Sequence, residues 1–106
     1  MPKYLLRGRY TASGLQGAVK EGFTSRETYI RRIAELMQSK VESVFWTFGD
    51  DHFHIVVDMP DAATAVARTI ATNLTGATEV SMTPLFTAEE MDAALALLPE
   101  YRAPAA

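Results

Sequence analysis

Two histidines separated by one residue, His52 and His54, are the side chains of this 106-residue chain that most directly suggest chemistry. On a β-strand, residues two apart point to the same face, so both imidazoles are expected to project side by side. That spacing suits two metal ligands, and a histidine that titrates near neutral pH can also act as a general base. Because no third metal ligand is evident, we predict neither a metal site nor a cofactor. His54 is the candidate catalytic base.

Charged side chains are expected to share this face. Strand alternation places Arg7 and Arg9 together on the first strand and Glu79 on the last. Two guanidinium groups on one face can bind a carboxylate or a phosphate, and an intersubunit salt bridge is the alternative use. The candidate ligand-binding residues, all expected around one pocket on that face, are Arg7, Arg9, His52, His54 and Glu79.

The residues just before the histidines have the composition of a hairpin turn, namely Gly49, Asp50 and Asp51. Adjacent residues in a turn point apart, so the two aspartates do not suggest an acid–base pair. We expect Gly49 to adopt a backbone conformation that costs other residues energy.

Four strands are predicted from β-branched and aromatic content and from alternation. They cover Lys3 to Tyr10, Val41 to Phe48, His52 to Asp58, and Thr78 to Leu85. On the first, third and fourth strands, the apolar set is expected under the helices. On the second strand, Val44, Trp46 and Phe48 are expected on one face, with Phe45 and Val41 on the other.

Helices are predicted from capping residues and apolar spacing. Thr11 begins a short glycine-containing segment that ends near Gly22, and a Thr24–Glu27 capping box opens a helix to about Ser39. Asp61 caps a third helix to about Leu74, and a Thr87–Glu90 box opens a terminal helix that Pro99 stops. The apolar stripes expected to be buried are Ile30, Ile33, Ala34 and Met37 on the second helix, and Ala63, Val66, Ala67, Ile70 and Leu74 on the third; the terminal helix carries Met91, Ala94, Leu95 and Leu98.

The order β-α-β-β-α-β with one added helix predicts an α+β, ferredoxin-like fold. Right-handed crossovers give an antiparallel four-stranded sheet in the order 4-1-3-2, with both main helices on one face. We expect one domain over residues 1–106, with a folded core at 1–98 and a tail at 99–106.

The face of this sheet without helices must also be covered, because it carries a large aromatic side chain, that of Phe45. Two such sheets packing face to face would cover it. We therefore expect a homo-oligomer, a dimer or higher, whose interface uses this face and part of the second strand.

Composition excludes several classes of function. A net charge of −3 argues against nucleic acid as the partner, because phosphate-backbone binding needs clustered cations. The absence of cysteine excludes disulfides, thiolate metal sites and cysteine nucleophiles. No apolar run approaches the roughly 20 residues of a membrane span, so a cytoplasmic protein without membrane contact is expected.

The chain resembles the GYD-domain family along most of its length. The resemblance covers the opening MPKYLLRGRYTASGLQGAVKEGFTSRE, the hairpin FWTFGDDHFHIVVDMPD, the segment TPLFTAEEMDAAL and the tail YRAP. Gly49 stands at the family's glycine, whereas the tyrosine position reads Asp51 and the following aspartate position reads His52. The resemblance implies a ferredoxin-like, dimeric α/β-barrel type of fold and does not imply a particular activity.

Three functions remain open at this level. The one we favour is a non-catalytic oligomeric binding or accessory protein with a possible small-molecule ligand, since no motif typical of a catalytic site appears. The alternative is a small enzyme of the dimeric α/β-barrel type, oxygenase- or isomerase-like and without a cofactor, with its pocket on the helix-free face. A nucleic-acid or membrane-surface module fits the acidic balance least.

Overall fold

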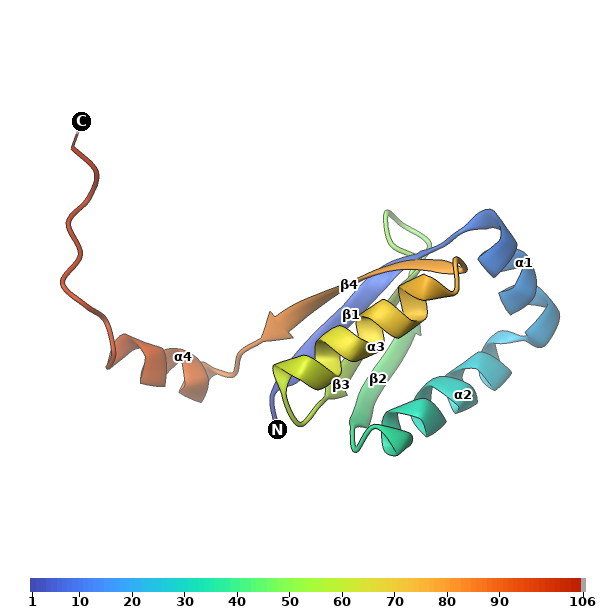
Figure 1. Cartoon of the computed structure of the whole chain (residues 1–106), viewed down its shortest axis with the longest axis horizontal. Helices are drawn as coiled ribbons and strands as arrows, with labels where there is room; N and C mark the ends of the chain where they lie inside the picture. Colours follow the sequence, from blue (N-terminus) through green and yellow to red (C-terminus); the bar gives the residue numbers. More distant parts are fainter. Residues whose placement is uncertain (106) are drawn as a thin grey trace.

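The fold is α+β, as predicted, in a computed structural model that describes residues 1–105 (Figure 1). Its elements are β1 (Lys3–Tyr10), α1 (Ala12–Glu21), α2 (Phe23–Leu36), β2 (Lys40–Trp46), β3 (Phe53–Asp58), α3 (Ala62–Leu74), β4 (Thr78–Leu85) and α4 (Ala88–Leu95). The four strands form one antiparallel sheet in the order β2-β3-β1-β4, which confirms the predicted strand order. Helix α2 packs near β2 and helix α3 near β4.

The core lies between this sheet and the helices. Alternation along β1 buries Tyr4 and Leu6 and leaves Arg7 and Arg9 exposed, as predicted from the sequence. On β3 the same alternation buries Phe53, Ile55 and Val57. The other buried members of the core cluster are Ile30, Ala34, Val41, Val44, Met59 and Ala65.

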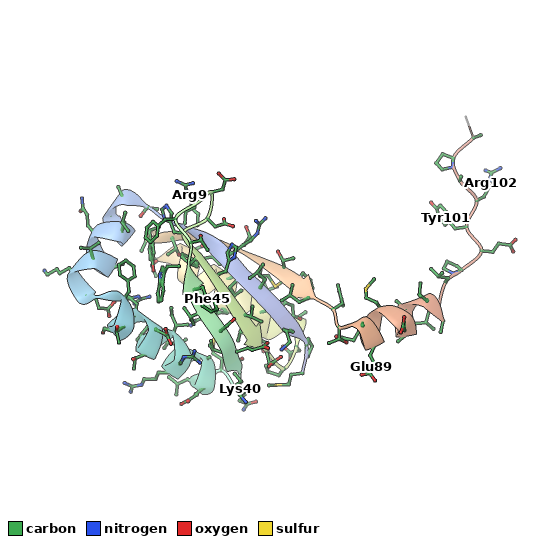
Figure 2. All side chains as sticks on the ribbon, turned by 180° about the vertical axis from the view of Figure 1, so that it is seen from behind. Arg9, Lys40, Phe45, Glu89, Tyr101 and Arg102 are labelled. Carbon is green, nitrogen blue, oxygen red and sulfur yellow. The ribbon has the colours of Figure 1, made fainter. Side chains whose placement is uncertain are left out.

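The prediction for β2 was wrong about Val41. The register between β2 and β3 shifts between Val41 and Ser43, so one extra residue interrupts the alternation. A β-bulge of this kind moves every later side chain to the other face. Val41 and Val44 are therefore both buried, and Phe45 is left 67% exposed on the opposite face, where Figure 2 labels it.

The prediction for the turn was also wrong about its strained residue. The positive φ, 54°, belongs to Phe48, and Gly49 is not among the glycines with positive φ in the described chain, which are Gly22 and Gly76. A Cβ added at Gly49 would meet nothing within 4 Å. The hairpin between β2 and β3 thus places its left-handed residue one position earlier, at an exposed aromatic side chain.

Three of the predicted helix caps form. The Thr11 hydroxyl accepts a hydrogen bond from the Gly14 amide, and Thr87 and Glu90 make the reciprocal capping box of α4. The Asp61 carboxylate accepts hydrogen bonds from the hydroxyl and the backbone amide of Thr64, which hold the pKa of Asp61 below its ordinary value.

The predicted Thr24–Glu27 box does not form. Helix α2 begins two residues earlier, with Gly22 in the N-cap position in place of Thr24. The φ of 95° at Gly22 turns the chain out of α1, and no side chain caps α2. Thr24 consequently lies inside the first turn, and Glu27 pairs with Arg31 at 3.1 Å. The helix ends at Leu36 and not near Ser39.

Helix α3 has the predicted length, but the face that it packs against the sheet is opposite to the predicted one. Ala65 is its buried residue, and the stripe expected to be buried is exposed, including Val66, Ile70 and Leu74. Small and hydroxyl side chains face the sheet, so the helix can lie close to it. The bulky apolar side chains therefore point away from the core.

At two glycines, Gly8 in β1 and Gly14 in α1, the backbone of another segment approaches so closely that a side chain would not fit. A Cβ at Gly8 would collide with the carbonyl group of Glu79 on β4, and one at Gly14 with the carbonyl group of Ala77. In contrast, a Cβ at Gly17 would meet nothing within 4 Å. Gly14 thus sets how closely α1 lies against the start of β4.

Helix α4 and the tail extend from the end of β4 away from the body of the molecule (Figure 1). Every residue from Phe86 to Ala105 is exposed. Among residues 1–105, no helix combines the length and apolarity needed to cross a membrane.

Candidate functional site

A cleft of about 940 Å³ lies on the helix-covered side of the sheet. Side chains of β1 and β3 line it, among them Leu6, Phe53 and Ile55. Residues of α1 and α2 contribute on one side and residues of α3 on the other. Small residues of both sides, Gly17 and Ala71 among them, leave this space open. The cleft is within the usual size range of small-molecule sites and has a mainly apolar lining.

Arg68 is the cation that α3 places in this cleft. It is the one charged residue of α3, and it lies on the side of the helix that faces α2. Its side chain is partly buried, and burial lowers the pKa of the guanidinium. Within residues 1–105, no carboxylate lies within 4.0 Å of Arg68, and its guanidinium donates no hydrogen bond to a protein atom. An arginine remains charged at physiological pH, so the cleft holds a partly desolvated positive charge.

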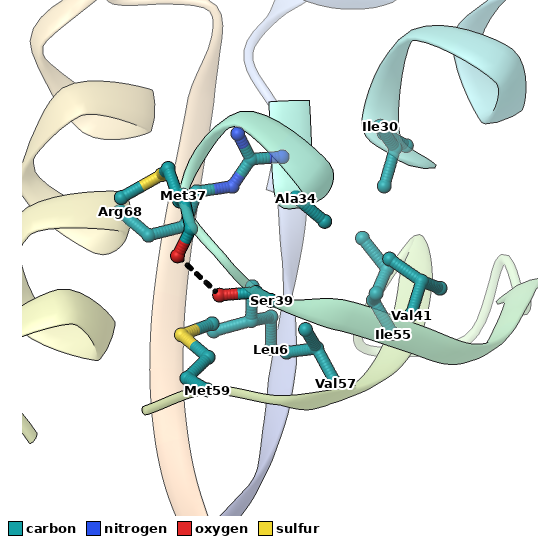
Figure 3. A pocket seen from close by; sticks show the side chains of 10 residues that line it. All are labelled: Leu6, Ile30, Ala34, Met37, Ser39, Val41, Ile55, Val57, Met59 and Arg68. Carbon is teal, nitrogen blue, oxygen red and sulfur yellow. Dashed lines mark hydrogen bonds between the residues drawn. The ribbon is translucent and has the colours of Figure 1, made fainter. Parts of the chain in front are cut away.

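The end of the Arg68 side chain lies beside the last turn of α2 (Figure 3). There it borders a cavity of about 10 Å³ together with Ala34 and Met37. The nearby Ser39 hydroxyl donates to the Met37 carbonyl at 3.0 Å and, among the described residues, accepts no hydrogen bond from Arg68. Arg68 thus lines both the cleft and this small cavity.

Aromatic side chains border the cleft where β1 and β2 approach α1. The Trp46 indole donates to the Tyr10 hydroxyl at 3.2 Å, and both residues line the cleft. The Phe23 ring packs edge-on against Trp46, with centroids 5.3 Å apart. On α2, Arg26 lies over the Tyr29 ring at 5.1 Å and pairs with Glu21 at 3.3 Å, so its charge is already balanced.

The helix-free face brings together some of the residues predicted as a site. The Asp51 carboxylate lies 3.2 Å from both the Arg7 guanidinium and the His54 imidazole. Arg7, Arg9, Asp51 and Glu79 line a polar hollow of about 470 Å³. Unlike the cleft, this hollow is lined mainly by polar and charged side chains.

His52 does not join His54, which corrects the expectation that both project from one strand face. His52 precedes β3, and its Nδ1 accepts a hydrogen bond from the Tyr10 amide at 3.0 Å. Its ring stacks against those of Tyr10 and Phe48, with centroids 6.0 and 5.4 Å away. The strand begins one residue later than predicted, so alternation does not extend to His52.

In residues 1–105, no group of three or more histidine, aspartate or glutamate side chains is placed to hold a metal ion. Instead, the Asp51 carboxylate and its two neighbours, Arg7 and His54, form a network of charged and polar side chains on the helix-free face. Arg9 extends this network, because its guanidinium donates to the Asp50 carbonyl at 2.8 Å.

The cleft was missed by the sequence-based prediction, which considered only the helix-free face. Its signal lies in α3, where the segment AATAVARTIATNL contains a single charged residue. An isolated cation in an otherwise uncharged helix that packs on a sheet is unusual, because surface helices typically carry charges on their outer face.

Comparison with protein families shows a match to the GYD domain over residues 4–95. Comparisons with curated proteins and with solved structures produced no match. The match spans β1 to the end of α4 and therefore includes both the cleft and the helix-free face. The chain belongs to the GYD-domain family.

Proposed function

We propose that this protein binds a small amphipathic anion, an apolar carboxylate, in the cleft between α2 and α3. The observation that carries the proposal is Arg68, a cation in an apolar cleft with no anionic partner among the described residues. A ligand carboxylate would supply that partner, and the apolar part of the ligand would contact Leu6, Phe53 and Ile55.

The energetics favour this class of ligand over a neutral one. A partly buried charge without a partner costs free energy, and a hydrogen bond to a charged group contributes about 1.5–3 kcal/mol. A planar guanidinium also suits a carboxylate by forming two parallel hydrogen bonds. Of the other cations that line the cleft, Arg26 pairs with Glu21 and Lys20 is exposed, so Arg68 would determine the preference for anions.

Two fluorescent probes of similar shape test this preference. 8-Anilinonaphthalene-1-sulfonate is anionic, and N-phenyl-1-naphthylamine is its neutral counterpart. Arg68→Met is expected to weaken binding of the anionic probe at least tenfold, because the anion loses its charged partner, and to leave affinity for the neutral probe within about twofold. Affinities are measured by fluorescence titration.

Two variants control the experiment. Arg32→Met removes an exposed cation from α2 and should change neither affinity. Ala71→Trp fills the cleft and should abolish binding of both probes. Equal losses of both probes in Arg68→Met, or amide shift changes in NMR spectra that centre on His54 and not on Ala71, would contradict the proposal.

We further propose the assembly predicted from the sequence, a homodimer of ferredoxin-like subunits whose helix-free faces pack together as in dimeric α/β barrels. Its support is an apolar group on that face: Phe45 is 67% exposed, and Leu5 and Val56 are partly exposed. Burial of a large aromatic side chain is a strong driving force for association.

Phe45→Glu tests this assembly. Light scattering should report a mass of at least twice 11.7 kDa for the native chain and a marked fall for the variant, because a charge would be buried at the interface. Arg32→Glu, an exposed change on α2 and so away from the helix-free face, is the control and should leave the mass unchanged. A native chain that scatters as a monomer at micromolar concentration would refute the dimer.

The contacts of Asp51 favour a second candidate function, an enzyme site on the helix-free face. Its carboxylate lies 3.2 Å from both Arg7 and His54, so Asp51, which lines the hollow, would orient His54 beside it as a general base, and a second subunit would close the site. The NMR comparison described above distinguishes this site from the cleft, since bound ligand would then perturb His54.

A further inference from the structure

We propose that the C-terminal arm, residues 86–101, packs on the outer surface of α3 of a second copy of this chain, and that the two copies exchange arms reciprocally. The inference rests on two apolar surfaces that are both exposed to solvent in the single chain. They are the arm itself and the outer stripe of α3.

The arm is rich in large apolar side chains, which are usually buried, yet all of its residues are exposed. Its large apolar side chains are more than half exposed, from 54% at Met91 to 84% at Tyr101. Met91 and Leu95, four residues apart, share one face of α4. The helix ends at Leu95, earlier than the predicted stop at Pro99, and Leu98 follows it in the tail. A helix of eight residues is too short to be stable in water by itself, so α4 needs a surface to pack on.

The outer surface of α3 offers such a surface. Ile70 is 53% exposed and Leu74 80%, and Val66 lies one turn before Ile70. The only charged residue of this helix, Arg68, lines the cleft, so the outer stripe bears no charge. A surface helix without charges on its outer face is typical of an interface.

The geometry favours a second copy as the occupant. In Figure 1, α4 lies beyond the end of β4, on a path that continues away from α3. Only Phe86 and Thr87 separate β4 from α4, and the Thr87–Glu90 capping box sets the start of the helix at that point. The arm therefore leaves its own α3 uncovered and presents its apolar face to another molecule.

The area is sufficient for a stable dimer. Four side chains of the arm (Phe86, Met91, Leu95, Leu98) and three of α3 (Val66, Ile70, Leu74) would meet in each contact. At roughly 100 Å² of apolar surface each, two reciprocal contacts bury on the order of 1,400 Å². Reciprocal contacts are also those of a closed two-fold dimer, which leaves no unpaired arm.

Disulfide cross-linking tests the contact directly, because the native chain contains no cysteine. The single variants Leu95→Cys and Ile70→Cys are mixed and oxidised. We expect a covalent dimer of twice 11.7 kDa that contains a 95–70 peptide pair by mass spectrometry. Ala93→Cys, on the opposite face of α4, is the matched control and should cross-link to Ile70→Cys at least tenfold more slowly.

Two outcomes would overturn the proposal. One is a 95–70 cross-link that forms no faster than the control. The other is a double variant, Leu95→Cys with Ile70→Cys, that yields only an internally linked monomer, which would mean that the arm folds back on its own α3. Both residues are exposed within one chain, so loss of folding does not confuse the result. The sheet-face dimer is tested separately by Phe45→Glu.

Discussion

Gly14→Ala is expected to lower the free energy of unfolding by about 2 kcal/mol or more, the cost of overpacking at a tight contact. The added Cβ would occupy the position of the Ala77 carbonyl group. That group is backbone, which cannot rotate aside as a flexible side chain can. Helix α1 would have to move away from β4, and the hydrogen bond from the Thr11 amide to the Ala77 carbonyl, 2.9 Å, would be strained.

Gly17→Ala is the matched control, three residues further along the same helix. Its Cβ would meet nothing within 4 Å, so only the intrinsic preference for alanine in a helix remains. This variant is expected to gain about 0.5–1 kcal/mol. Urea unfolding measures both changes as shifts of the midpoint at constant slope. Equal effects of the two substitutions would show that α1 does not approach β4 as closely as described.

Arg68→Met is expected to stabilise the ligand-free protein by about 1–2 kcal/mol, because an unpaired, partly buried charge is replaced by an apolar side chain of similar length. The difference should narrow with ligand. At a concentration of the anionic probe one hundred times its dissociation constant for the native chain, the native chain gains about 2.7 kcal/mol, whereas a variant that binds tenfold more weakly gains about 1.4 kcal/mol.

The measurement is thermal unfolding of both proteins with and without 8-anilinonaphthalene-1-sulfonate. Arg32→Met serves as the control and should stay within about 0.5 kcal/mol of the native chain in both conditions, because its side chain is exposed. A ligand-free Arg68→Met variant that is less stable than the native chain would show that Arg68 has a structural role, and that binding an anion is not needed to explain its position.

Much of the fold follows from local patterns. The limits of β1 and β4 agree with the prediction residue for residue, and three of the four predicted caps form, because each depends on side chains within about four residues. The errors in β2 and at the turn have separate causes. A bulge adds a residue that the alternation of side chains does not reveal, and strain at Phe48 depends on how the two strands close.

The candidate site was harder to predict, because alternation assigns faces but does not say which face is hollow. Arg7, Arg9 and Glu79 lie on the helix-free face as expected, and Asp51 is the residue that connects Arg7 with His54. His52 lies apart, because the strand begins after it. The cleft depends on the spacing between α2 and α3, which no local segment determines.

The sequence by itself determined the order of elements, the sheet and its apolar side, because these depend on period and on capping residues close in the chain. Only the tertiary structure decided which side of α3 faces the sheet. The apolar stripe of Val66, Ile70 and Leu74 predicts burial against the core, yet the small residue Ala65 is the one that is buried. The face of a helix that packs on a sheet is the one whose side chains fit the space between them. In this chain that packing places Arg68 in the cleft and leaves the stripe exposed.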